Sequence, residues 1–111
     1  MDRLGLPFVA WLVLVAAAVL EVGGDAVIRK GLRGGHAAYI AGGCLLLAGY
    51  GLAVNQVRWD FSRLLGVYVG FFALASALAG HFLFGEGVRP STWAGLGLIV
   101  VGGLVIQFGP R

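Results

Sequence analysis

The chain has 111 residues, of which 59% are hydrophobic and 12% are charged, and its mean hydropathy is +0.94. A water-soluble domain of this length could not bury so much apolar surface, so the composition excludes a soluble globular protein and indicates that a lipid bilayer surrounds much of the chain. The single cysteine, Cys44, excludes an internal disulfide framework.

Four apolar segments follow one another, at about residues 4–28, 37–57, 64–84 and 92–108, separated by short polar breaks. Each is close to the ~20 residues that a helix needs to cross a hydrocarbon core of ~30 Å. Lipid offers no hydrogen-bond partners to the backbone, so each segment should be a helix. The alternating segments of ~10 residues that are typical of membrane β-barrels are absent. The sequence therefore predicts an all-α membrane protein, with four transmembrane helices in a single domain over residues 1–111.

The first segment carries Glu21 in the middle of an otherwise apolar run. A charged acid at bilayer depth costs roughly 2.5 kcal/mol or more and therefore usually marks a site for an ion, a proton or a substrate. We predict that Glu21 binds protons and a cationic substrate. The alternative is a protonated glutamate that only hydrogen-bonds a neighbouring helix. Its neighbours one turn away on the same helix face are mostly small and leave room for a ligand: Ala17, Ala18, Gly24 and Asp25.

Asp25 has two interpretations. Arg29 follows it at a spacing of four residues, so an ion pair within the helix would neutralise Asp25 and leave Glu21 as the titratable acid. Alternatively, Asp25 is a second carboxylate of the site, and a dimer would then offer four acids to a divalent or doubly charged substrate. We favour the ion pair.

Arg3, the apolar stretch and the small residues at 16–18 are also typical of a cleaved signal peptide. However, apolar sequence resumes beyond Glu21, and Asp2 is unusual in the charged start of such a peptide. We therefore interpret the segment as a membrane helix.

The third segment contributes an aromatic group, Tyr68, Phe71 and Phe72. Aromatic faces hold organic cations by cation–π attraction, so these residues are predicted to line the substrate cavity, with Tyr68 in contact with the substrate. Ordinary packing is the alternative for the two phenylalanines, and equally for Tyr39 and Tyr50 of the second segment. The three tryptophans are expected in belts at the membrane interfaces: Trp11, Trp59 and Trp93.

Small residues form stripes along the last two segments. In the third, Gly66 and Gly70 begin a stripe that continues at residues 73, 77 and 80, and in the fourth, Gly95 and Gly102 lie seven residues apart. Such stripes let helices approach closely in lipid. We predict that both stripes pack helices, and that the stripe of the fourth segment is the contact between two chains.

The loop charges leave the orientation of the chain open. With four spans, the termini and residues 58–63 place four Lys or Arg residues on one side, and residues 29–36 and 85–91 place four on the other. Orientation follows this bias, which is zero here. The chain is therefore a candidate for dual insertion, in which two copies in opposite orientations form an antiparallel homodimer. A single orientation, fixed by the first helix or by the cluster Arg29-Lys30-Arg33, is the alternative.

The sequence contains no nucleophile with a matching base, no phosphate-binding loop and no nucleic-acid-binding patch, so neither an enzyme nor a nucleic-acid partner is expected. His36 and His81 lack the spacing of metal ligands, and we expect no metal site and no cofactor. Asp60 and either Ser91 or Thr92 precede helical segments and are expected to be N-caps.

Two stretches of the chain resemble the small multidrug resistance family. Glu21-Val22-Gly23-Gly24, followed by Arg29-Lys30-Gly31, is similar to the first helix of that family, in which a membrane glutamate is followed closely by a glycine and then by a basic residue. Phe84-Gly85-Glu86 and the sequence WAGLGLIVVG at residues 93–102 resemble its last hairpin and fourth helix. In length, helix count and acid position, the resemblance covers nearly the whole chain.

The resemblance implies an antiparallel, dual-topology homodimer in the bacterial inner membrane that exchanges protons for cationic substrates by alternating access. Glu21 would be the shared proton and substrate site, and Gly95 and Gly102 would lie at the dimer contact. The third segment departs from the family pattern, because Tyr68 stands where the family has a tryptophan and Phe72 replaces a glycine. These departures fall where the substrate should bind, so the identity of the substrate does not carry over.

Together, these features predict a proton-coupled antiporter that exports small organic cations, such as guanidinium-like or quaternary ammonium compounds. The alternative is a lipid-carrier flippase subunit or a structural partner of another membrane protein, because residues 86–93 also resemble a hairpin in subunits that flip aminoarabinose-linked lipid carriers. The membrane glutamate favours the antiporter.

Overall fold

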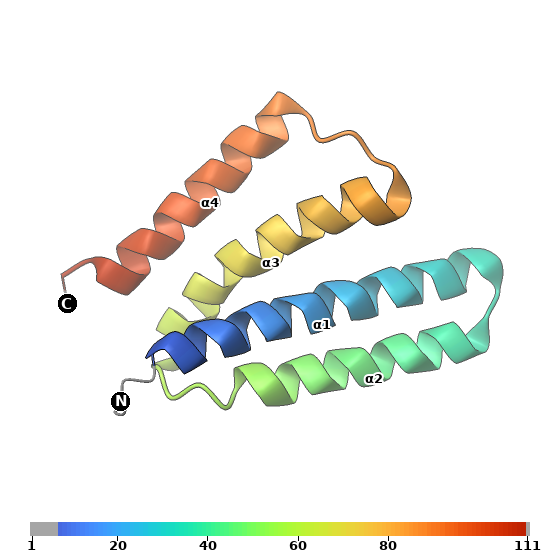
Figure 1. Cartoon of the computed structure of the whole chain (residues 1–111), viewed down its shortest axis with the longest axis horizontal. Coiled ribbons are helices and arrows are strands. Elements are labelled where there is room, and N and C mark those ends of the chain that lie inside the picture. The colour runs from blue at the N-terminus through green and yellow to red at the C-terminus, as the bar shows by residue number, and fades with distance from the viewer. Residues whose placement is uncertain (1–6, 111) are drawn as a thin grey trace. The chain divides into compact units, whose positions relative to one another are not determined.

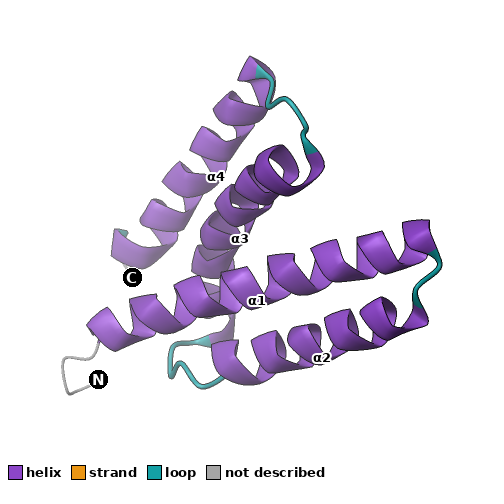
Figure 2. Cartoon of the chain, turned by 45° about the vertical axis from the view of Figure 1, so that its right-hand side comes forward, coloured by secondary structure: helices purple, strands orange, loops and turns teal. Residues whose placement is uncertain are grey.

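Residues 7–110 are described in the computed structural model of the chain, and they form four α-helices joined by loops (Figure 1; Figure 2). The helices are α1 (Pro7–Gly34), α2 (Ala37–Val54), α3 (Phe61–Phe84) and α4 (Pro90–Phe108). All four are long and apolar enough to cross a membrane. The predicted all-α fold with four transmembrane helices is therefore confirmed; the start of the first predicted segment, residues 4–6, lies outside the described residues.

The first helix is longer than its apolar segment. The sequence predicts an end near Ile28, whereas α1 continues to Gly34. Hydropathy marks only the part of a helix that lipid can bury, and the Arg, Lys and Leu residues beyond this point are good helix formers in any solvent. The helix ends where Gly35 adopts a left-handed conformation with a φ of 71°, and the amide N–H of His36 donates to the carbonyl oxygen of Gly31 over 2.9 Å.

Three other helix ends differ slightly from the prediction. The second helix ends at Val54 instead of residue 57, the third begins at Phe61 instead of 64, and the fourth begins at Pro90 instead of 92. The side-chain amides of Asn55 and Gln56 donate to the carbonyl oxygens of residues 51 and 52, over 2.8 and 3.3 Å. The carbonyl oxygen of residue 51 also accepts the backbone N–H of Asn55 over 3.4 Å, so these side chains add hydrogen bonds to the last carbonyl oxygens of α2.

The predicted N-caps are only partly correct. Asp60 occupies the N-cap position of α3 but makes no side-chain capping hydrogen bond. Ser91 and Thr92 lie inside α4, whose N-cap residue is Arg89, so that prediction is wrong. Pro90 accounts for the difference, because its fixed φ suits the first turn of a helix and it has no N–H group that needs a cap.

The chain divides into two compact units, residues 1–58 and 59–111, and each is a helical hairpin. In the first hairpin, α1 and α2 approach most closely at Gly24 and Gly43. A Cβ atom at Gly24 would lie 2.9 Å from the carbonyl oxygen of Gly43, and a Cβ atom at Gly43 would lie 2.7 Å from that of Gly24. The absence of both side chains therefore lets the two backbones come into contact, as in other lipid-embedded helix pairs.

In the second hairpin, α3 and α4 pack through a glycine and an isoleucine. A Cβ atom at Gly66 would lie 2.7 Å from Cδ1 of Ile106. Towards the loop that precedes α3, Nε of Arg63 donates to Oε1 of Gln107 over 3.0 Å, and the Arg63 guanidinium lies 4.5 Å from the ring centroid of Trp59. These two contacts orient a cation at one end of the hairpin.

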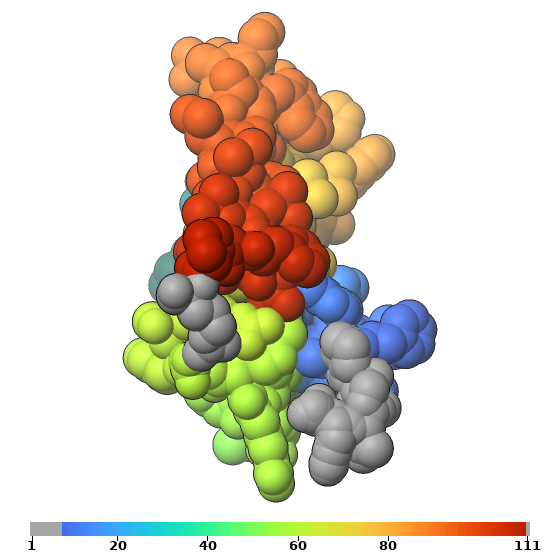
Figure 3. All heavy atoms as spheres, turned by 90° about the vertical axis from the view of Figure 1, so that its left-hand side faces the viewer, coloured from blue at the N-terminus to red at the C-terminus, as the bar shows by residue number. Residues whose placement is uncertain are grey.

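The outer surface of α4 is apolar and open. None of its residues is buried, and Leu98 and Phe108 are 75% and 71% exposed. Figure 3 shows the atoms of this helix, in orange and red, at the surface of the space-filling view. A surface of this kind is unusual in a soluble monomer but matches a lipid environment or a contact with another membrane helix.

Candidate functional site around Glu21

Glu21 is half-buried in the interior of α1. Ala17 and Ala18, one turn before it, are 0% and 3% exposed, and Gly24, one turn after it, is also buried. These neighbours carry a methyl group or no side chain, so they do not crowd the carboxylate from its own helix. A partly buried acid in a membrane-spanning helix is the setting in which a carboxylate exchanges protons and cations.

The packing of α1 against α2 sets Tyr50 opposite Glu21. Across the hairpin, a Cβ atom at Gly24 would lie 3.0 Å from Cγ of Leu47. The two helices are antiparallel, so three residues back along α1 and three residues forward along α2 lead to Glu21 and Tyr50. The negative charge of Glu21 also acts electrostatically on Tyr50, which is half-buried. The site of the first hairpin therefore contains a carboxylate and a phenol from facing helices.

Tyr50 was not among the residues predicted from the sequence to belong to the Glu21 site. Hydropathy gives no reason to prefer it over Tyr39, because both are aromatic residues of the same apolar segment. The short turn at Gly35 and His36 could have identified Tyr50 as the residue opposite Glu21. Glu21 and Tyr50 each lie fourteen residues from that turn, and equal steps along two antiparallel helices of equal rise end at the same level.

Asp25 lies one turn beyond Glu21 on α1, and it is exposed whereas Glu21 is half-buried. The two carboxylates thus differ in environment although they share a helix and lie on neighbouring positions of its surface. Arg29 is exposed as well, one turn further on. The ion pair between Asp25 and Arg29 stays a prediction.

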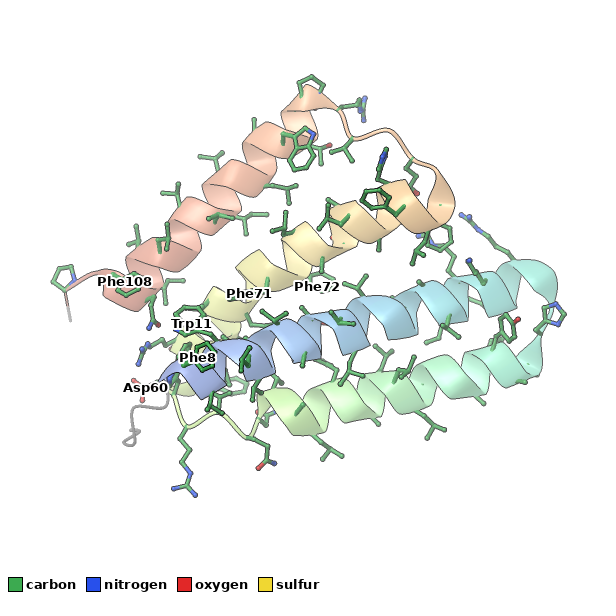
Figure 4. All side chains as sticks on the ribbon, viewed as in Figure 1. Phe8, Trp11, Asp60, Phe71, Phe72 and Phe108 are labelled. Atoms are coloured by element: carbon green, nitrogen blue, oxygen red, sulfur yellow. The ribbon has the colours of Figure 1, made fainter. Side chains whose placement is uncertain are left out.

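The predicted aromatic group belongs to the second hairpin. Tyr68 is buried, with 3% of its surface exposed, and its ring centroid lies 6.4 Å from that of Phe72, with an angle of 33° between the ring planes. Phe71 is half-buried, and Figure 4 shows it beside Phe72 on α3. Tyr68 and Phe72 therefore form one aromatic pair, at the separation at which rings attract one another. A cavity shared with Glu21 stays a prediction.

The predicted packing glycines fall into two groups. Gly66 lies against Ile106 within its own hairpin, so a side chain there would force a neighbour to move. At Gly70, Gly95 and Gly102, by contrast, a Cβ atom would meet nothing within 4 Å. A helix that packs closely on these three glycines must therefore be one from outside the hairpin of α3 and α4.

The two histidines lie at helix ends, His81 in the last turn of α3 and His36 at the N-cap position of α2. Nδ1 of His81 lies 2.9 Å from the carbonyl oxygen of Glu86, and its ring makes an edge contact with Phe82 at 4.8 Å between centroids. His36 packs against Tyr39, with ring centroids 5.2 Å apart. Over residues 7–110, no group of three His, Cys, Asp or Glu side chains is placed to hold a metal ion.

Similar proteins occur in several bacteria, and all three described below are named UPF0060 membrane proteins. A UPF0060 membrane protein of Arthrobacter sp. (strain FB24) is 36% identical over 104 residues, which are 90% of each chain. One of Mycolicibacterium gilvum (strain PYR-GCK) is 34% identical over 104 residues, 90% of this chain and 94% of the relative. One of Clavibacter sepedonicus is 38% identical over 99 residues, 86% and 87% of the two chains.

No protein-family model matches the chain, and no solved structure matches it. The names of the three relatives state a membrane location and no activity. None of these names mentions the small multidrug resistance family, so the resemblance of the chain to that family stays a prediction. With the four spanning helices, the relatives establish a multi-pass bacterial membrane protein.

Proposed function

The chain belongs to the UPF0060 family of membrane proteins, and within that frame we propose that it is a proton-coupled antiporter of small organic cations. It would export guanidinium-like or quaternary ammonium compounds across the bacterial inner membrane by alternating access. The observation that carries the proposal is Glu21, a half-buried carboxylate within a membrane-spanning helix, flanked by small residues and faced by Tyr50.

The chemistry of coupling follows from one carboxylate that serves two cations. A protonated Glu21 is neutral and has no charge with which to hold a cationic substrate, whereas the carboxylate form binds either a proton or the substrate. Occupancy by one therefore excludes the other, and this exclusion couples their opposite movements. The Tyr50 hydroxyl is suited to donate a hydrogen bond to the carboxylate form and to orient it towards the substrate.

The transporting unit would be an antiparallel homodimer in which each protomer contributes Glu21. Four helices are too few to enclose a substrate path, and the balanced loop charges permit both orientations. The α4 face with Gly95 and Gly102 is the proposed contact, because it is open in the single chain and small residues favour close packing in lipid. Tyr68 and Phe72, with Phe71, would supply aromatic faces to the cation.

Reconstitution tests the proposal. The purified chain in proteoliposomes should take up guanidinium or tetraalkylammonium when an outward proton gradient is imposed, and Glu21→Gln should reduce this uptake to the level of protein-free liposomes. Asp25→Asn is the matched control, since it removes an exposed acid one turn away and should keep most of the activity. Full proton-driven uptake by the Glu21 variant would refute the proposal.

A second candidate is a lipid-carrier flippase subunit or a structural partner of another membrane protein. The exposed and apolar α4 supports it, because that surface could also receive a helix of a different protein. A single orientation in the membrane, measured with reporter proteins fused to the C-terminus, would favour this candidate. Signal from both sides of the membrane would favour the antiparallel homodimer.

A further inference from the structure

The strongest concentration of positive charge among the described residues lies at the end of α1. Arg29, Lys30 and Arg33 fall within five consecutive positions, and all three are exposed. No other loop region of the described chain matches this charge. Residues 58–63 combine two arginines with one aspartate, and residues 85–91 combine one arginine with one glutamate. We call the three residues at the end of α1 the hairpin-end cluster.

The length of α1 places this cluster outside the hydrocarbon core. A helix of 28 residues is about 42 Å long, whereas the core is about 30 Å thick, so about 12 Å of α1 must project into the polar layers. Residues 7–20 contain no charge, whereas the last six residues contain three, so the projecting part is the C-terminal one. Tyr39, which is 50% exposed and packs against His36, lies beside this end, as interfacial tyrosines do.

The cluster also faces away from the partner helix of its hairpin. Gly31 marks the side of α1 that packs on α2, because a Cβ atom there would lie 2.9 Å from Cβ of Tyr39. At ~100° per residue, Lys30 lies roughly 100° and Arg29 and Arg33 roughly 160° around the helix axis from Gly31. Within the hairpin, Arg29 and Arg33 are therefore directed away from α2, and Lys30 lies to the side of it, all at the depth of the lipid phosphates.

We propose that the hairpin-end cluster binds the headgroups of anionic phospholipids, of the phosphatidylglycerol and cardiolipin class. An arginine guanidinium can bind a phosphate through two parallel N–H···O hydrogen bonds, and the lysine adds a positive point charge nearby. Cations at a helix C-terminus also complement the helix dipole, but that effect is confined to the last turn and does not select among lipids. This binding site is separate from Glu21, and the inference holds whether or not the chain transports cations.

The test compares two variants of the full chain that lose the same charge. In bilayers that contain spin-labelled lipids, the wild-type chain should immobilise phosphatidylglycerol in preference to phosphatidylcholine. Lys30→Gln combined with Arg33→Gln should lower this preference at least about fivefold, since one basic residue near an anionic surface contributes a factor of about five. Arg58→Gln combined with Arg89→Gln removes the same charge from two exposed positions outside the cluster and should lower the preference clearly less than the first variant does.

Three results would overturn the proposal: an unchanged preference in the Lys30 and Arg33 variant, an equal loss in the Arg58 and Arg89 variant, or release of the labelled lipid by inorganic phosphate at constant ionic strength. Circular dichroism of each variant verifies that the helices are retained. The charge-conserving pair Lys30→Arg and Arg33→Lys should keep the preference, which separates loss of charge from a disturbed helix end.

Discussion

Replacing Gly43 with alanine should destabilise the first hairpin, whereas the same replacement at the adjacent Gly42 should not. A Cβ atom at Gly43 would lie 2.7 Å from the carbonyl oxygen of Gly24 and would also collide with Cγ1 of Ile28. To reach an ordinary contact of 3.4 Å with that oxygen, α1 and α2 must separate locally by about 0.7 Å. At Gly42 a Cβ atom would meet nothing within 4 Å.

The magnitude follows from the difference between the two positions. Both lie inside α2, so the gain in helix propensity from glycine to alanine is the same at each and cancels in the comparison. What remains is the overpacking at Gly43, which typically costs about 1–3 kcal/mol. The free energy of unfolding of Gly43→Ala should therefore be lower than that of Gly42→Ala by about 1–3 kcal/mol.

The assay is equilibrium unfolding of the purified chain in mixed micelles, with increasing SDS and with helix content followed by circular dichroism. The Gly43 variant should unfold at a clearly lower SDS fraction than the Gly42 variant. Coincident unfolding curves would show that the two backbones do not touch at this point, and the placement of Tyr50 opposite Glu21 would lose its basis as well.

Two further predictions concern the site and the assembly. Tyr50→Phe removes only the hydroxyl of the tyrosine opposite Glu21 and should slow proton-driven uptake about five- to tenfold, the effect of losing a hydrogen bond of about 1–1.5 kcal/mol. Tyr39→Phe, near the turn, should transport normally, and equal activity of both variants would exclude a role for Tyr50. Isoleucine at both Gly95 and Gly102 should abolish cross-linked dimers while helix content is retained, because bulky side chains separate closely packed helices. Isoleucine at Gly97, which is exposed on another side of α4, should preserve the dimers, and a dimer that survives the double replacement would place the contact elsewhere.

The number and type of the elements could be predicted because the bilayer imposes them. A run of about twenty apolar residues has to be a helix in lipid, so hydropathy alone finds all four. The ends of the helices were harder to predict, because they depend on backbone hydrogen bonding rather than on burial. The extension of α1 to Gly34 and the start of α4 at Pro90 are both set by local conformation, at Gly35 and at the proline itself.

The candidate site was predictable in part for a related reason. Glu21 stands out in sequence because a single charge in an apolar run is costly and rarely accidental. Tyr50 does not stand out, because an aromatic residue in a membrane segment is common and its position relative to Glu21 depends on how two helices pack. That packing is set by the contact between Gly24 and Gly43 and by the turn at Gly35.

The sequence by itself determined that this protein spans a bilayer four times and carries an acid within its first span, because both properties depend on the transfer of individual residues from water to lipid. The tertiary structure decided which residues face one another. It separated glycines that pack within a hairpin, such as Gly24 and Gly43, from glycines that remain open, such as Gly95 and Gly102. Helix register depends on close contacts between atoms of distant residues, and no property of a single residue encodes those contacts.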